Sequence, residues 1–270
     1  MGSEMCIRDS SWCKKQVFVS RLCRESGQVT SPQNLFTAPV TAHILFDPAV
    51  AVMQRHDHRE KSRSSIGLTA SQGYDHNIMT DNISSAIKKP AGTTLPGLDK
   101  PIALVGLMGS GKSVVGRCLA RQLQLKFADS DQLVTKMAGV TIVDIFDLAG
   151  EAKFRDMELR AIQKQLKKPP HVLATGGGAF CEAQTAALLR DNALVVWLQA
   201  SPETLLKRIG DVSSRPLLQT SSPLQILQQL SATREPFYSK AHLHLNTDGF
   251  TMAKAVAALV SGLDSYLAKQ

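Results

Sequence analysis

A glycine-rich loop at residues 106–113 is the part of this chain best suited to chemistry. It reads Gly-Leu-Met-Gly-Ser-Gly-Lys-Ser and directly follows the apolar segment 102–105. Glycines let backbone N–H groups converge on an anion, and a helix behind the loop directs its positive end at the same point. In such a loop Lys112 reaches the outer phosphates of a nucleotide, and the Ser113 hydroxyl holds magnesium. The predicted nucleotide-binding set also includes Gly109, Ser110, Gly111 and Val114.

Two carboxylates, Asp129 and Asp131, stand two residues apart at the end of the next apolar segment. With this spacing at a strand end, both side chains project to the same side of the chain. One is suited to assist magnesium at the phosphates, and the other to meet a substrate hydroxyl. A structural alternative is that Ser130 or Asp131 caps the helix that follows. Capping would account for one acid but not for both.

A second group of charged residues suits a carboxylate-bearing substrate. Arg155 and Glu158 are three residues apart, so on a helix they share a face. An arginine held by a neighbouring carboxylate offers a rigid fork to the carboxylate of a ligand. An ordinary surface pair is the alternative, and this motif alone favours it.

Three consecutive glycines, Gly176, Gly177 and Gly178, follow the apolar segment 171–175. A simple turn needs only one glycine, and each costs backbone entropy. The triplet therefore predicts a place where a ligand approaches the backbone closely, with a flexible hinge as the alternative.

Further arginines lie beyond the triplet, and for each of them a solvated surface position is the alternative. Arg208 is expected late in a helix, and Arg234 lies just before a proline. Arg215 falls in the segment 211–223, which has no strong helical pattern. That composition predicts a mobile lid that closes over the nucleotide and brings Arg215 to the transferring phosphoryl group.

The elements that must position these residues alternate between strands and helices from residue 98 onward. This alternation predicts an α/β fold with a parallel sheet covered on both faces, whose ligands gather at the carboxyl ends of the strands. The expected strands are 102–106, 126–129, 171–175, 193–199 and 242–246. The expected helices are 112–124, 130–138, 141–148, 151–167, 182–190, 202–210, 223–239 and 250–267.

Residues 1–97 differ from the rest and show no lasting helical or strand period. A disordered tail, an organelle-targeting segment and an upstream stretch that is not native to the enzyme all remain open. Eleven basic residues stand beside eight acidic ones here, and this acidic content weakens the targeting interpretation.

The composition of the whole chain limits the class of protein. The net charge of +8 has no dense basic block behind it, so we expect no nucleic-acid partner. No apolar run approaches the ~18 residues that span a bilayer, so we expect no membrane association. Five cysteines with no zinc-like spacing favour a reducing compartment. We therefore expect a cytoplasmic location, with organelle targeting as the alternative. We also expect a monomer, although the composition does not bear on the oligomeric state.

Taken together, these motifs resemble the shikimate kinase family over about residues 101–247. The elements that carry the resemblance occur in family order: the loop 106–113, Asp129-Ser130-Asp131, Gly150-Glu151 with Phe154-Arg155, Gly176-Gly177-Gly178, Arg215-Pro216-Leu217-Leu218, and Arg234 with Pro236 and Tyr238. The resemblance implies the three-layer α/β/α sandwich of P-loop NTPases, with a five-stranded parallel sheet and a mobile lid. We assign the domain that contains it to residues 98–270 and treat residues 1–97 as an extension.

The resemblance also implies the reaction, transfer of the γ-phosphoryl group of ATP to the 3-hydroxyl of shikimate with Mg²⁺ as cofactor. By analogy Asp131 binds the substrate hydroxyls and accepts the proton of the 3-hydroxyl. Arg155 and Arg234 hold the substrate carboxylate, and the backbone of the glycine triplet closes that pocket. Lys112 and Arg215 stabilise the transferring group. Ser113 and Asp129 position magnesium, and Arg208 packs near adenine. Val114 departs from the family, which often has threonine there.

Two other functions remain open. One is a kinase of another small acceptor, such as gluconate or a nucleoside monophosphate. The other is a nucleotide-binding regulatory domain without turnover, although Lys112, Asp129, Asp131 and Arg215 are all present.

Overall fold

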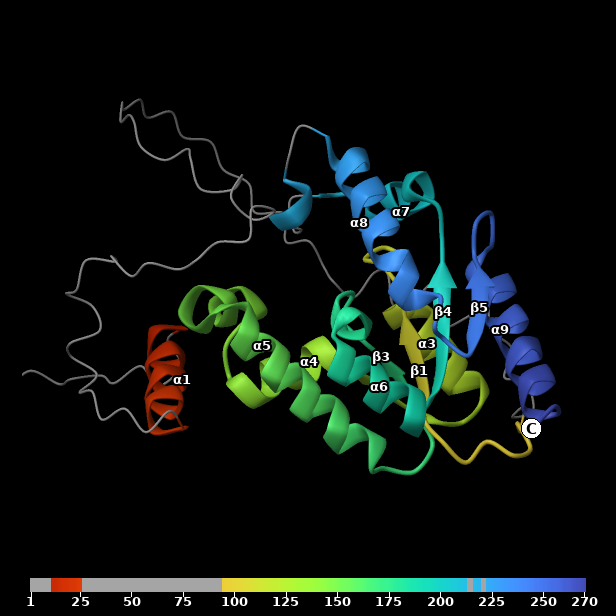
Figure 1. The fold of residues 1–270 in the computed structure, drawn as a ribbon, viewed down its shortest axis with the longest axis horizontal. Helices are drawn as coiled ribbons and strands as arrows, with labels where there is room; N and C mark the ends of the chain where they lie inside the picture. The colour runs from red at the N-terminus through yellow and green to blue at the C-terminus, as the bar shows by residue number, and fades with distance from the viewer. Residues whose placement is uncertain (1–10, 26–93, 213–215, 220–221) are drawn as a thin grey trace, which may run out of the picture. The chain divides into compact units, whose positions relative to one another are not determined.

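The computed structural model describes residues 11–25, 94–212, 216–219 and 222–270, and these belong to one compact unit (Figure 1). The strands of this part are β1 (Ile102–Val105), β2 (Lys126–Asp129), β3 (His171–Ala174), β4 (Leu194–Gln199) and β5 (Leu243–Asn246). Its helices are α1 (Ser11–Glu25), α3 (Lys112–Gln122), α4 (Ser130–Ala138), α5 (Ile142–Leu166), α6 (Ala183–Asn192), α7 (Pro202–Ile209), α8 (Pro223–Tyr238) and α9 (Met252–Leu267), with 3-10 turns η2 (Ala179–Cys181) and η3 (Pro216–Leu218).

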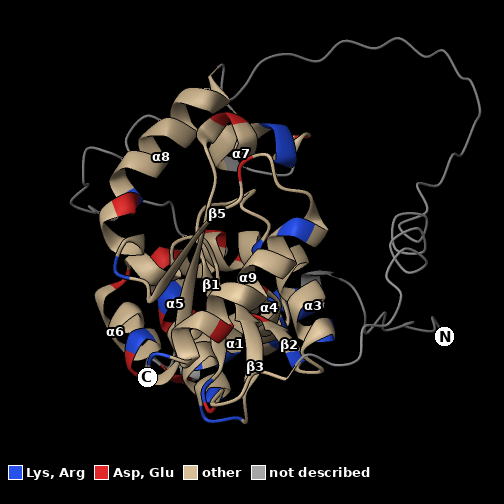
Figure 2. Cartoon of the chain, turned by 90° about the vertical axis from the view of Figure 1, so that its right-hand side faces the viewer, with Lys and Arg blue, Asp and Glu red and all other residues tan. Residues whose placement is uncertain are grey.

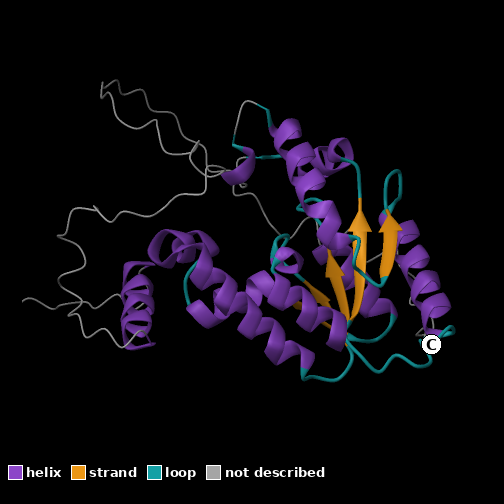
Figure 3. Cartoon of the chain, viewed as in Figure 1, coloured by secondary structure: helices purple, strands orange, loops and turns teal. Residues whose placement is uncertain are grey.

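The five strands form one parallel sheet in the order β2-β3-β1-β4-β5, with helices on both sides (Figure 3). This confirms the predicted α/β fold and its five-stranded parallel sheet. From the central strand β1, the chain runs to the edge strand β2, returns to β3 beside β1, and then adds β4 and β5 on the other side of β1. The carboxyl ends of β1 and its neighbour β3 therefore meet at a switch point, where open α/β sheets bind their ligands.

Strand β1 shows why the sheet needs helices on both faces. All four of its side chains are fully buried. Because side chains alternate along a strand, Ile102 and Leu104 pack with α3 and α9, whereas Ala103 and Val105 pack with residues of α5, α6 and α8. A continuous apolar run therefore specifies a central strand of the three-layer sandwich.

Local signals in the sequence set the helix boundaries near the site. Asp129 caps α4 by accepting a hydrogen bond from the N–H of Asp131, and Thr141 forms a capping box with Asp144 at the start of α5. Helix α5 is interrupted at Gly150, where φ is 76° and ψ is 174°. The break separates the two helices predicted at 141–148 and 151–167.

Helix α1 lies in the stretch for which the sequence predicted no regular element, so that expectation is wrong for these residues. Phe18 is 3% exposed and packs against α4 and α5. Lys15 pairs with Asp144 at 2.6 Å, and Glu25 pairs with Lys153 at 2.8 Å. The helical period was missed because polar residues interrupt a short apolar face. The remaining residues of the predicted extension up to 93 lie outside the described part of the chain.

Charged residues of both signs are interspersed over the described helices (Figure 2). Several of them pair along one helix, as Arg160 does with Asp156 at 3.1 Å. Within the described residues, no helix combines the length and the apolar character that a bilayer crossing requires.

A chain that begins at Thr94 should fold into the same sandwich, because every strand of the described sheet starts at residue 102 or later. We expect it to melt in a single cooperative transition, below that of the full chain because the α1 contact is lost. Thermal unfolding followed by circular dichroism measures this. A shortened chain without a cooperative transition, beside a full chain that has one, would contradict the prediction.

Candidate functional site

The loop between β1 and α3 surrounds the ammonium group of Lys112. Its Nζ donates hydrogen bonds to the carbonyls of Gly106 at 2.8 Å and Leu107 at 2.7 Å, and it lies 3.4 Å from Ser110 Oγ. Lys112 is 9% exposed, so one positive charge is held at the first turn of α3. A buried cation beside a helix N-terminus favours an anion at this place.

Gly109 is the loop position that most clearly requires glycine. Its φ is 79°, a conformation that L side chains rarely adopt. A Cβ here would also lie 2.9 Å from the carbonyl of Leu205 in α7. The absence of a side chain therefore lets the loop pack directly on α7.

Ser113 and Asp129 form an oxygen-rich pair beside the loop. Ser113 Oγ donates to Asp129 Oδ2 at 2.7 Å, while Asp129 Oδ1 accepts from the N–H of Asp131 at 3.1 Å. Asp129 thus caps α4 and also contacts Ser113 of α3, whereas the capping alternative names Ser130 or Asp131 as the cap. A hydroxyl and a carboxylate are ligands that fit Mg²⁺ held with nucleotide phosphates.

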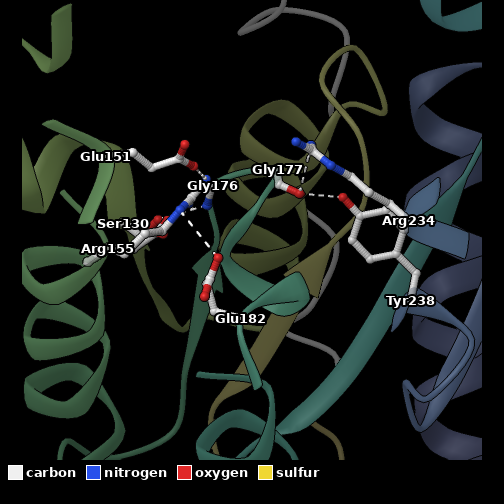
Figure 4. Close-up of polar contacts among 9 residues, drawn as sticks. Ser130, Glu151, Arg155, Gly176, Gly177, Glu182, Arg234 and Tyr238 are labelled. Carbon is white, nitrogen blue, oxygen red and sulfur yellow. Dashed lines mark hydrogen bonds and ion pairs between the residues drawn. The ribbon is translucent and has the colours of Figure 1, made fainter. Parts of the chain in front are cut away.

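The glycine triplet after β3 is the place where the charged residues of the site converge (Figure 4). The N–H of Gly176 donates to Ser130 Oγ at 2.8 Å. A Cβ on Gly176 would lie 2.9 Å from Asp131 Oδ1 and would collide with Glu158 Oε1. The two carboxyl groups therefore approach the backbone from α4 and α5.

Gly178 lies against the guanidinium of Arg155, where a Cβ would collide with Arg155 Nη2. Arg155 Nη1 donates to Glu158 at 2.7 Å and Nη2 to Glu151 at 3.1 Å, while Nε lies 3.9 Å from Glu182 (Figure 4). Burial disfavours the charge, but Glu158 and Glu151 outweigh it and keep the pKa of Arg155 above its ordinary value. Its Nε has no hydrogen-bond partner within the described structure.

Glu158 is a buried carboxyl group, 1% exposed, that the sequence identified only as the partner of Arg155. Burial raises its pKa, the ion pair with Arg155 opposes this, and Asp131 adds to the rise. Among the described residues its Oε1 has no hydrogen-bond partner. The pair therefore places an acceptor oxygen and a fixed guanidinium close together beside the triplet.

Arg234 reaches the triplet from α8, on the other side. Its Nη1 lies 3.3 Å from the carbonyl of Gly177, and Tyr238 Oη donates to the same oxygen (Figure 4). A Cβ on Gly177 would be 3.6 Å from that Nη1 and 3.7 Å from Gly106 O. Gly177 therefore touches both Arg234 and the phosphate loop.

A cavity of about 440 Å³ extends along the phosphate loop toward α9. Its lining includes the site residues Lys112, Ser113, Asp131 and Gly177. It also includes Arg208, Thr247, Phe250, Thr251 and Met252.

Arg208 is held in place beside this cavity, because it donates to Thr247 Oγ1 at 2.9 Å and to Thr247 O at 2.6 Å. Val114 is 44% exposed and also lines the cavity. The polar groups of Arg208 and Thr247, together with the apolar side chain of Phe250, are suited to bind a planar nucleobase.

The structure thus brings the predicted loop, the acidic pair, Arg155, the triplet and Arg234 to one edge of the sheet. Arg215 lies outside the described residues, as do parts of the predicted lid at 213–215 and 220–221. In the described remainder of the lid, Leu218 is fully buried in the core. The sequence motifs gave no role to Tyr238 and did not identify Thr247, Phe250 or Met252 as residues of the site. Of these four residues, only Tyr238 lies in a motif, the segment Arg-Glu-Pro-Phe-Tyr.

Comparison with known proteins agrees with this geometry. The shikimate kinase family profile matches residues 108–263. A shikimate kinase of Caulobacter vibrioides is 46% identical over 164 residues, which cover 61% of this chain and 82% of that protein. A shikimate kinase of Brucella canis is 39% identical over 171 residues, which cover 63% and 86%.

Solved structures give the same result. The shikimate kinase from Acinetobacter baumannii in complex with shikimate is similar with a TM-score of 0.58 and 36% identity, covering 64% of this chain and 96% of that one. The enzyme from Aquifex aeolicus is similar with a TM-score of 0.53 and 30% identity, covering 61% and 96%. The sequence matches, the sheet and the phosphate loop agree, and the chain belongs to the shikimate kinase family.

Proposed function

We propose that this protein transfers the γ-phosphoryl group of ATP to the 3-hydroxyl of shikimate, giving 3-phosphoshikimate and ADP. The observation that carries the proposal is the convergence of Asp131, Arg155 and Arg234 on a glycine triplet that touches the phosphate loop. An acceptor with a carboxylate and several hydroxyls has complementary chemistry. Family membership supports the same reaction.

On the acceptor side, Arg155 and Arg234 bind the carboxylate. Both are always charged, and each presents a planar fork that matches two carboxylate oxygens. Glu158 holds Arg155 in place through the 2.7 Å ion pair. The backbone of Gly176, Gly177 and Gly178 forms the wall between them, because side chains there would displace the charged groups.

On the donor side, the loop amides and Lys112 bind the phosphates, and Arg208 with Phe250 flanks the base. Phosphoryl transfer demands alignment and charge neutralisation more than covalent chemistry. The 3-oxygen forms a bond to the γ-phosphorus, the bond from that phosphorus to the β-γ bridging oxygen breaks, and ADP leaves. Asp131 accepts the proton of the 3-hydroxyl, and Lys112 and Arg215 stabilise the negative charge on the transferring group.

Ser113 and Asp129 are the residues that would hold Mg²⁺. When bound with the nucleotide, the ion neutralises phosphate charge. The Ser113–Asp129 hydrogen bond of 2.7 Å supports this assignment, because it already orients both oxygens beside the loop.

We also propose that residues 98–270 are the catalytic unit and that it works as a cytoplasmic monomer without nucleic-acid or membrane partners. The described site draws its residues from this range. Cys118 and Cys181, whose side chains the structure describes, are free thiols, which supports a reducing compartment.

The proposed reaction is tested by ADP release, coupled to NADH oxidation, with shikimate, gluconate and nucleoside monophosphates supplied in parallel. We expect turnover with shikimate at least about a hundredfold above the others. A site whose polar groups are placed for one substrate discriminates by at least this factor against a substrate that leaves those groups unpaired. Faster turnover with gluconate or a nucleoside monophosphate would identify another acceptor. No turnover with any of them would favour a regulatory nucleotide-binding role.

Lys112→Ala should lower kcat by at least about a hundredfold, because it removes a positive charge that stabilises the transition state. The steady-state rate at saturating ATP and shikimate measures this. The folded state is checked by the thermal transition of the variant. Unchanged turnover would show that Lys112 does not act on the transferring group.

Arg155→Ala should raise the KM for shikimate by at least about tenfold, because charge-assisted hydrogen bonds to a carboxylate are lost. The KM for ATP should change by less than about twofold. Arg160→Ala is the matched control, since Arg160 lies on the same helix, is 53% exposed and pairs only with Asp156 among the ion pairs of the described residues. Equal rises in both KM values would argue against the assignment.

A further inference from the structure

Tyr238, the last residue of α8, has a polar group that packing alone does not explain. The side chain is 1% exposed, and its ring lies 5.6 Å from the ring of Trp197. A phenylalanine would fill this space equally well. The hydroxyl instead donates to the carbonyl of Gly177, in the middle of the triplet.

We propose that Tyr238 is a positioning residue for the acceptor side of the reaction, which fixes the peptide between Gly177 and Gly178 together with Arg234. This inference rests on the proposed function and adds to it a residue that acts through others.

The geometry of the peptide bond between Gly177 and Gly178 determines where its N–H points. The described chain contains no cis peptide, so the carbonyl of Gly177 and the N–H of Gly178 point in opposite directions. Two donors on α8 hold the carbonyl: Tyr238 Oη and Arg234 Nη1, the latter at 3.3 Å. The N–H of Gly178 is therefore directed away from α8.

That N–H is suited to bind a ligand. Within the described residues it donates to no protein acceptor, although the neighbouring amides of Gly176 and Ala179 do. Arg155 lies against Gly178 and Arg234 lies near Gly177, so the two cations proposed to bind the substrate carboxylate are both close to this peptide. An acidic or hydroxylated acceptor would accept a hydrogen bond from it at a fixed angle.

The shared carbonyl also links Tyr238 to Arg234. Glycine peptides rotate easily because no Cβ restricts them. With one of its two donors removed, the carbonyl of Gly177 would be held by Arg234 alone, and both groups would gain freedom. Burial raises the pKa of the Tyr238 hydroxyl, so it stays protonated and remains a donor over the working range of an enzyme.

Tyr238→Phe tests the inference, because it removes one oxygen and keeps the ring. We expect the KM for shikimate to rise about three- to tenfold, because this is the change in affinity that corresponds to the net free energy of one hydrogen bond. The KM for ATP should stay within about twofold of the parent value. Amide hydrogen exchange over residues 175–180 should become faster.

Tyr266→Phe is the matched control, since Tyr266 lies on α9 and its ring contacts His242 at 6.1 Å, away from the triplet. It should change neither KM value. In the background of Arg234→Ala, the Tyr238→Phe change should cost less than in the parent, because both act on one carbonyl.

The outcomes separate this inference from the proposed function. A parent enzyme that does not phosphorylate shikimate would contradict the proposed function itself. An active parent with an unchanged shikimate KM and unchanged hydrogen exchange in Tyr238→Phe would overturn only the role of Tyr238. Equal rises in the KM values for shikimate and ATP would also overturn it, since they would indicate a general loss of structure.

Discussion

The site depends on the absence of side chains at the carboxyl end of β3. Three charged groups approach the backbone there from three different helices: Asp131 from α4, Arg155 from α5 and Arg234 from α8. None of the three glycines has a positive φ, so the backbone conformation does not require them. Gly176 and Gly178 are required because the neighbouring side chains leave no space for a Cβ. A methyl group on Gly176 or Gly178 would occupy the positions of Glu158 or Arg155.

This arrangement buries charged groups, and the burial of a charge costs free energy of folding. Glu158 is almost fully buried, and its pKa is raised because burial outweighs its attraction to Arg155. Such pairs contribute little net stability, yet removal of one partner leaves an uncompensated charge and is strongly destabilising. The pair is therefore better understood as a device that fixes a guanidinium in one orientation. Glu151 and Glu182, which are exposed, hold the same guanidinium more weakly.

Most of the fold could be predicted because local signals agreed with one another. The continuous apolar run 102–105 indicated a central strand, and Gly150 marked a break between two helices. Helix α1 could not be predicted in this way, since Phe18 packs against residues of α4 and α5 that are distant in sequence.

The candidate site was predictable where glycines and charged residues occur in motifs. The burial of Glu158 was not, because its spacing from Arg155 is the same in a solvated surface pair. Thr247 also escaped prediction. Its role follows from hydrogen bonds to Arg208, 39 residues away in the chain, and to the carbonyl of Gln199. Contacts of this kind depend on the order of strands β4 and β5 in the sheet.

The order of the strands also explains why the nucleotide site and the acceptor site both border the glycine triplet. Because β3 is inserted between β2 and β1, the turn that follows it lies next to the phosphate loop that follows β1. Thr175 strengthens this junction, since its N–H and its hydroxyl both donate to the carbonyl of Leu104. Gly177 then lies within 3.7 Å of Met108 N, measured from where its Cβ would be. The triplet therefore forms the wall of the acceptor pocket beside the nucleotide loop, and the two donors to the carbonyl of Gly177 hold that wall in place.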